Sequence, residues 1–209
     1  MKKVIVLDLD ETLEHGVIDD KAGTANMILR PNLDVLINKL KEVKKRKIDV
    51  ILCTTARNEW VEKFLVQKPE FRKIFDKIYT RDNEGIWKKF SKEEYPLEYK
   101  AKNENINLEY SKPITTFGYD SILFFEDNKT EYARLDILFK LTEGKLKKDV
   151  TFYNVEKYLR DVNKEDFECI NMTKAIDFFE NKDFKIGLTE LKKWENNYYL
   201  FSRLIFSLL

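Results

Sequence analysis

The sequence of 209 residues has few of the residue types on which several kinds of protein depend. Its two cysteines, Cys53 and Cys169, are too few for a disulfide framework and lack the CxxC spacing of a zinc site. The single histidine, His15, excludes a histidine-rich metal site. Four prolines and six glycines are too few for a string of domains on flexible linkers. We therefore expect a globular protein of a reducing compartment, in which carboxylates would carry any catalysis.

Neither the charge nor the apolar segments point to nucleic acid or to a membrane span. The 38 basic and 37 acidic residues leave a net charge of +1, so no general positive field attracts nucleic acid. No segment approaches the roughly 20 apolar residues that cross a bilayer, and the apolar run near Met1 is too short for a signal peptide. We expect a cytoplasmic protein. The basic run 44–47 could dock an acidic surface, although cations at a helix end also complement the helix dipole.

Three short apolar segments predict the centre of an α/β fold. The segments 4–7, 50–53 and 122–125 are rich in β-branched and aromatic residues and do not alternate with polar ones, as is typical of strands buried on both faces of a parallel sheet. Each ends on polar residues. Because the carboxyl ends of parallel strands share one edge of the sheet, three polar residues should converge there: Asp8, Thr55 and Asp127.

Helical periodicity follows the first two strands. Apolar residues recur at helical spacing after Pro31, and again after Asn58, which we take as a helix cap. Segment 82–111 is polar with weak periodicity and predicts a small loop or hairpin insertion. From about residue 163 the pattern is helical, with a heptad-like seam near the end. We therefore expect a core over 1–162 and a helical C-terminal extension over 163–209.

The C-terminal extension is more apolar than one core-facing helix requires. Its last dozen residues are apolar nearly all round. Packing on the chain's own sheet is the default expectation. The excess favours contact with a partner, with a segment that follows in a longer chain, or with a membrane surface. The sequence leaves the oligomeric state open.

The first strand leads into two carboxylates placed two residues apart. Asp8 and Asp10 can both leave the sheet while Leu9, between them, stays anchored in the core. In such a pair one carboxylate can attack while the other manages protons. A bare pair of this kind is just as compatible with an acidic turn. Only the surrounding sequence distinguishes a catalytic pair from such a turn.

The run Val6-Leu7-Asp8-Leu9-Asp10-Glu11-Thr12-Leu13, followed by His15, resembles the first motif of haloacid-dehalogenase (HAD) superfamily phosphatases. It is most similar to the branch of RNA polymerase C-terminal-domain phosphatases and NLI-interacting-factor-like proteins, whose motif usually reads DLDETLVH, so that Glu14 departs from it. Further segments match in order over about residues 1–160: 30–34, 53–57, 75–82, 111–120 and 125–128. The resemblance implies a Rossmann-like α/β fold with a mostly parallel sheet flanked by helices.

The resemblance also implies a set of roles. Asp8 would be the nucleophile that forms an aspartyl-phosphate, and Asp10 the general acid and base. Mg²⁺ would be bound by the Asp8 carboxylate, the Asp10 backbone carbonyl and Asp127. Thr55 and Lys112 would bind the phosphoryl group. Thr54 competes with Thr55 for this role. Glu126 would stabilise Lys112 or the metal site without being a metal ligand itself.

The spacing of the motifs bears on the substrate. The interval between Asp10 and Thr55 is too short for a large cap domain. An open site suits a phosphate carried on a macromolecule, so we expect a phosphoprotein, with phosphotyrosine and phosphoserine/threonine both open. The alternatives are a small-molecule phosphomonoesterase and a non-catalytic or membrane-recruited binding module.

Overall fold

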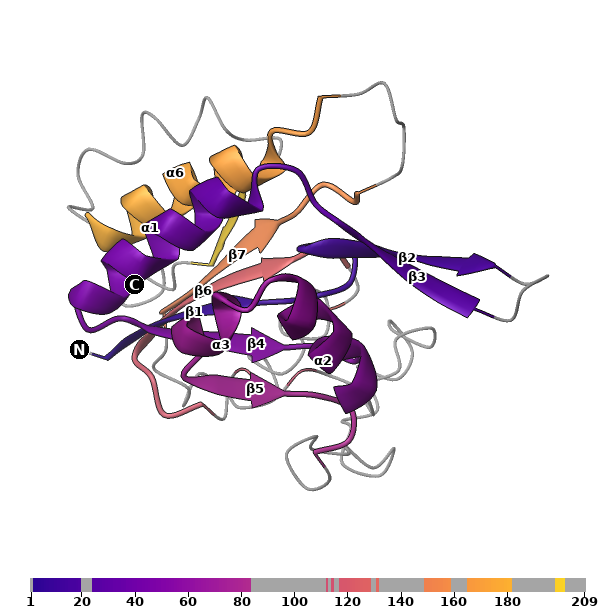
Figure 1. Ribbon diagram of the computed structural model, residues 1–209. Helices are drawn as coiled ribbons and strands as arrows, with labels where there is room; N and C mark the ends of the chain where they lie inside the picture. Colours follow the sequence, from indigo (N-terminus) through magenta and orange to yellow (C-terminus); the bar gives the residue numbers. More distant parts are fainter. Residues whose placement is uncertain are drawn as a thin grey trace, which may run out of the picture.

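A computed structural model describes residues 2–19, 24–83, 112, 114, 117–128, 131, 149–158, 165–181 and 198–201 (Figure 1). The predicted insertion at 82–111 therefore lies outside the described residues, apart from Asp82 and Asn83. The last eight residues of the chain also lie outside them. In the part of the chain that is described, no helix has both the length and the apolar composition that a membrane crossing needs.

A six-stranded sheet forms the centre of the fold. Its order is β5-β4-β1-β6-β7-β8, and the first five strands are parallel. The three strands predicted from the sequence are neighbours at its middle, which confirms them. The bounds are β1 Lys3–Leu7, β4 Asp49–Cys53, β5 Lys77–Tyr79, β6 Ser121–Glu126, β7 Asp149–Asn154 and β8 Tyr198–Phe201.

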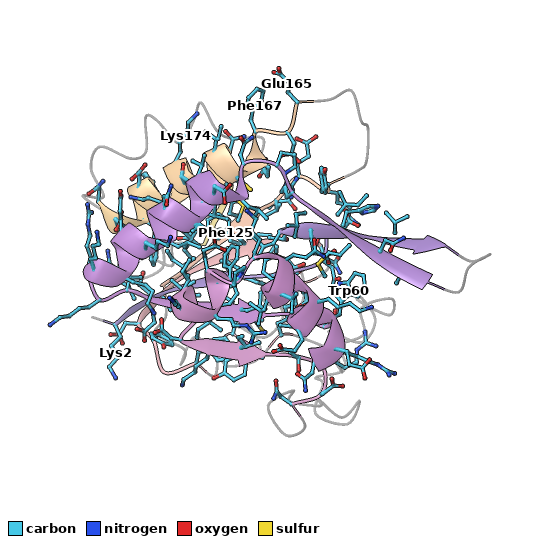
Figure 2. The ribbon with its side chains drawn as sticks, in the orientation of Figure 1. Lys2, Trp60, Phe125, Glu165, Phe167 and Lys174 are labelled. Carbon is cyan, nitrogen blue, oxygen red and sulfur yellow. The ribbon has the colours of Figure 1, made fainter. Side chains whose placement is uncertain are left out.

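The central strands are apolar without alternation because both faces of the sheet are covered. On one face, Ile5, Leu7 and Phe125 pack against the helices, and Figure 2 labels Phe125 in this interior. On the other face, Val4 and Val6 pack with residues that include Ile114 and Phe117. This double burial is what the continuous apolar segments predict.

The described helices lie over one face of the sheet. They are α1 Leu33–Lys45, α2 Asn58–Gln67, α3 Phe71–Ile74 and α6 Glu168–Glu180. The helix predicted after Pro31 is confirmed as α1. Figure 1 shows α1 and α6 side by side, and Lys39 joins them through ion pairs of 2.6 Å to Asp177 and Glu180.

A hairpin near the site was not predicted from the sequence. Between β1 and α1 the chain forms a hairpin of β2 (Glu14–Asp19) and β3 (Thr24–Leu29). Figure 1 shows this hairpin extending beyond the carboxyl ends of the central strands. Its sequence does not alternate between apolar and polar residues, because the acidic Glu14 is buried at its base whereas Ala25 and Asn26 are both exposed. A two-residue period is therefore hard to see.

Two local predictions were wrong. Asn58 is the first residue of α2 and not its cap; its backbone N–H donates to the Asp82 carboxylate at 2.7 Å, so a distant side chain satisfies the helix end. The expected C-terminal helix exists as α6, but residues 198–201 form β8, antiparallel to β7. Tyr198-Tyr199-Leu200-Phe201 is an aromatic, apolar run with high β-propensity, and pairing covers the edge of β7.

The division into a core and an extension stays a prediction, but the two parts are closely packed. Buried residues of α6, among them Cys169, Met172 and Ile176, belong to the same hydrophobic cluster as Leu7 and Leu36. The helix after residue 163 therefore covers the sheet beside α1.

Candidate active site

The carboxyl ends of β1, β4 and β6 form one edge of the sheet, and the site lies along it. Asp8 directly follows β1, and its backbone N–H donates to the carbonyl of Phe125 at 3.0 Å. Asp8 is only 5% exposed. The topology therefore brings the end of β1 and the end of β6 together, although more than a hundred residues separate them in sequence.

The loop after Asp8 is fixed by two leucines and a tight turn. Leu9 and Leu13 are fully buried, and the Leu13 N–H donates to the Leu9 carbonyl at 2.8 Å. Glu11 adopts a left-handed backbone conformation with φ of 60°, which turns the chain into β2. This arrangement confirms Leu9 as the anchor between the two aspartates. Asp10 is left half-buried at the edge of the sheet.

A buried arginine braces this loop from behind. Arg30 donates to the carbonyls of Glu11 at 2.7 Å and Thr12 at 3.1 Å, to the Asp166 carboxylate at 3.0 Å and to the carbonyl of Glu156. It thereby ties the loop to the segments that precede α6. The sequence marked Arg30 only as part of a matching segment, and nothing in the sequence alone indicated this bracing role.

Lys112 lies between two carboxylates. Its Nζ is 2.5 Å from Asp8 Oδ1 and 2.5 Å from Glu126 Oε2, and all three side chains are buried. Burial alone would lower the pKa of Lys112, but the charges of Asp8 and Glu126 outweigh it and raise that pKa. Lys112 is therefore a permanent cation in contact with the predicted nucleophile.

Two buried carboxyl groups of this edge, those of Asp8 and Glu126, have raised pKa values. Burial raises the pKa of Asp8 to about 6, against the opposing pull of Lys112. Burial, followed by the charge of Asp8, also raises the pKa of Glu126 well above its ordinary value. At neutral pH the Asp8 carboxylate is thus mostly ionised, as a nucleophile must be.

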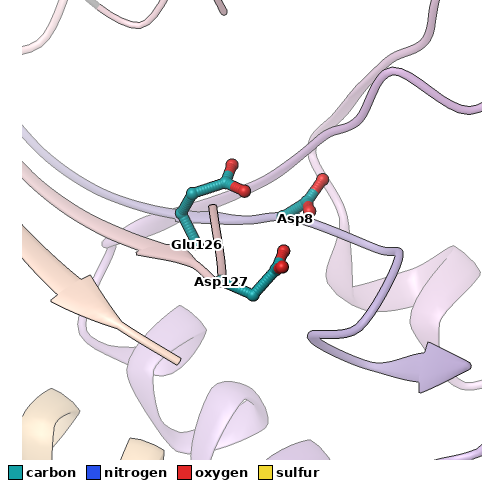
Figure 3. A group of neighbouring side chains, drawn as sticks. All are labelled: Asp8, Glu126 and Asp127. Carbon is teal, nitrogen blue, oxygen red and sulfur yellow. The ribbon is translucent and has the colours of Figure 1, made fainter. Parts of the chain in front are cut away.

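Three carboxyl groups converge in a way that suits a divalent cation. Oxygens of Asp8, Glu126 and Asp127 all lie within 4.8 Å of one another (Figure 3). Carboxylate oxygens are hard ligands, which suit Mg²⁺. The single buried ammonium group of Lys112 does not balance the three acidic groups. Glu126 already contacts Lys112 through Oε2 and accepts from the Asn128 N–H through Oε1 at 3.1 Å. Asp8 and Asp127 are therefore the better placed side-chain ligands.

The two threonines at the end of β4 differ in their surroundings. Thr54 is fully buried, and its hydroxyl donates to Asp10 Oδ2 at 3.3 Å while it accepts from the Ala56 N–H at 3.0 Å. Thr55 is half-buried. The phosphoryl-binding role of Thr55 stays a prediction, and the contact with Asp10 favours Thr54 as the residue directed into the site.

Glu14 and Trp60 form a part of the site that the sequence did not reveal. Glu14 is fully buried at the start of β2, and the indole N–H of Trp60 donates to Glu14 Oε1 at 3.0 Å. Figure 2 labels Trp60 on α2, beside the base of the hairpin. Burial, opposed by the hydrogen bond from Trp60 and reinforced by the neighbouring Asp10, raises the pKa of Glu14 to about 8. The only sequence signal was that Glu14 departs from the usual motif.

The class of protein follows from a match to a known family. Residues 3–169 match the model of the family described as NLI interacting factor-like phosphatase. This match, together with the parallel α/β fold, makes the chain a HAD-type phosphatase, which is a hydrolase. More particularly, the chain belongs to the NLI interacting factor-like phosphatases, as the resemblance of its motifs implied.

Several solved structures are similar to this chain at low sequence identity. The HAD domain of the effector protein Lem4 from Legionella pneumophila is 16% identical with a TM-score of 0.49, over 88% of this chain and 97% of that one. A hypothetical protein from Xanthomonas campestris is 15% identical with a TM-score of 0.35, over 65% of this chain.

A third solved structure is 3-deoxy-D-manno-octulosonate 8-phosphate phosphatase from Moraxella catarrhalis, with magnesium, phosphate and KDO bound. It is 13% identical with a TM-score of 0.33, over 62% of this chain. This chain spans 60% of the length of the Xanthomonas and Moraxella chains. No curated protein matches the sequence.

Proposed function

We propose that the protein is a Mg²⁺-dependent phosphoprotein phosphatase that works through an aspartyl-phosphate. The observation that carries the proposal is the buried Asp8, ion-paired with Lys112 at 2.5 Å and grouped with Glu126 and Asp127. A nucleophilic carboxylate needs both a fixed position and neighbouring positive charge to approach an anionic phosphate.

Each residue of the edge then has a chemical task. Asp8 Oδ attacks phosphorus, and Lys112 stabilises the negative charge on both the nucleophile and the phosphoryl oxygens. Asp10 protonates the leaving oxygen, and afterwards it takes a proton from the water that hydrolyses the intermediate. The hydroxyl of Thr54, 3.3 Å from Asp10, holds that carboxyl group in place. Thr55 remains the other candidate for contact with phosphoryl oxygens.

The metal would be bound by Asp8, Asp127 and the backbone carbonyl of Asp10. When bound, Mg²⁺ supplies charge that offsets the repulsion between the carboxylate and the phosphate. Glu126 supports Lys112 in this scheme, since both of its oxygens already have partners. Lys157, 3.5 Å from Asp127 and 58% exposed, lies at the outer side of the same edge.

The small size of the segment between Asp10 and Thr54 supports a phosphate carried on a protein. Between Asp10 and Thr54 the described residues form a two-stranded hairpin, a helix and a strand, and the hairpin strands have six residues each. A hairpin of that size can line one side of the site but is much smaller than a cap domain. We therefore place phosphotyrosine and phosphoserine/threonine peptides ahead of sugar phosphates as substrates.

A substrate panel tests this proposal. Phosphate release is measured with Mg²⁺ from matched phosphotyrosine, phosphoserine and phosphothreonine peptides and from sugar phosphates, with Asp8→Asn as the control for contaminating activity. We expect Mg²⁺-dependent release from at least one peptide and its loss in the variant. Efficient turnover of sugar phosphates alone would refute the proposal of a protein substrate. No turnover of any substrate in the panel would favour a binding module.

A further inference from the structure

A hollow lined by lysines lies on the helix-covered face, between the end of α1 and the segment that carries α3. Its volume is about 640 Å³, within the usual range of ligand pockets. Four cations and one acidic residue line it, together with Pro69 and Ile74. The charged lining residues are Lys41, Lys44, Lys45, Lys73 and Glu70.

The hollow lies far from the catalytic edge. α1 ends at Lys45 and β4 begins at Asp49, so the end of α1 is at the amino edge of the sheet, opposite Asp8. A five-residue strand such as β1 spans about 17 Å. The lysines therefore cannot contact a phosphate that is bound at Asp8.

Three of these lysines are exposed and form no ion pair in the described part of the chain: Lys41, Lys45 and Lys73. Nearby cations do have partners. Lys44 pairs with Asp76 at 2.5 Å, Lys68 with Asp34 at 2.8 Å, and Arg72 with Glu62 at 2.5 Å.

Helix energetics do not account for this group. Lys41 and Lys45 are four positions apart on α1, where like charges repel each other. Cations near a helix C-terminus complement its dipole, and this explains the position of Lys45. It does not explain Lys73, which lies on a different element. The fold thus leaves positive charge concentrated around a concave surface.

We propose that this hollow is a docking site for an acidic peptide segment of a partner protein. Carboxylates of the segment would pair with Lys41, Lys45 and Lys73, while its aliphatic carbons would contact Pro69 and the lysine stems. The lining has no arginine fork of the kind that recognises one compact phosphate. Its concave shape suits an inserted peptide better than a flat lipid surface.

Binding of a fluorescein-labelled oligoglutamate peptide to the full chain, followed by fluorescence anisotropy, tests the proposal. The test variant carries Lys41→Glu, Lys45→Glu and Lys73→Glu. A matched control carries Lys2→Glu, Lys63→Glu and Lys174→Glu, three exposed lysines outside the hollow, and therefore the same change in net charge. Circular dichroism of both variants checks that they fold.

We expect saturable, salt-sensitive binding to the wild type, weakened at least about tenfold by the test variant and less than about twofold by the control. A glutamine version of the peptide should not bind. Equal weakening by both variants, or no saturable binding to the wild type, overturns the proposal. Binding to phosphatidylserine vesicles in place of the peptide also overturns it. Phosphatase turnover of a peptide without acidic residues should be unchanged in the test variant, so this result is independent of the proposed function.

Discussion

Replacing Lys112 with methionine should destabilise the protein strongly, because it leaves two buried carboxylates without their counter-charge. Lys112 is 3% exposed, and its Nζ is 2.5 Å from both Asp8 and Glu126. Removal of one partner from a buried ion pair costs about 3–5 kcal/mol. The exposed Lys157, 3.5 Å from Asp127, provides a matched control, since a surface pair contributes only about 0–1 kcal/mol.

The loss should depend on pH. Without the ammonium group, the pKa values of Asp8 and Glu126 rise further, and protonation removes the uncompensated charge. Because the pKa of Asp8 is already about 6, the free energy lost in Lys112→Met should be larger at pH 8 than at pH 5. The double variant Lys112→Met with Glu126→Gln should recover part of the stability, since one buried charge is gone.

Urea unfolding of the wild type and variants, followed by circular dichroism at pH 5 and pH 8, measures these effects. We expect Lys112→Met to lose more unfolding free energy than Lys157→Met at pH 8, and equal losses in the two variants would contradict an uncompensated buried charge. A loss in Lys112→Met that is the same at both pH values would contradict it as well.

Three further changes probe the supports of the site. Arg30→Lys should cost about 3 kcal/mol in urea unfolding, because lysine cannot reach the several acceptors of the guanidinium; a loss below about 1 kcal/mol would refute the brace. In the wild type, the raised pKa of Glu14 makes the stability fall as the pH rises from 4.5 towards about 8. Glu14→Gln should therefore flatten this pH dependence in melting curves across that window. An unchanged pH dependence would refute the raised pKa of Glu14. Asp82→Ala should cost about 1 kcal/mol through loss of its bond to the start of α2; Asp34→Ala, in an exposed ion pair, should cost less.

The centre of the fold could be predicted because its physical cause is local. Strands β1, β4 and β6 need apolar residues on both faces, so each appears in the sequence as an uninterrupted apolar segment followed by polar residues. The helix α1 is equally visible, because its buried residues recur at helical spacing from Leu33 to Val43. Parallel pairing then places Asp8 and Asp127 at one edge without further information.

The parts that escaped prediction depend on contacts between distant segments. Nothing local shows that Arg30 braces the loop at Glu11, or that Asp82 satisfies the first turn of α2. Glu14 is an acidic residue in a polar context, and its burial depends on Trp60, which donates to it from α2, and on the neighbouring Asp10. The strand at 198–201 depends on the free edge of β7, which a heptad-like pattern cannot indicate.

Capture of the phosphorylated intermediate tests the central claim most directly. The protein is mixed with a phosphopeptide that it hydrolyses in the presence of Mg²⁺, quenched in acid, digested and examined by mass spectrometry. We expect a phosphoryl group on Asp8 in the wild type and none in Asp8→Asn. A phosphoryl group on another residue, or turnover that persists in Asp8→Asn, would contradict this expectation.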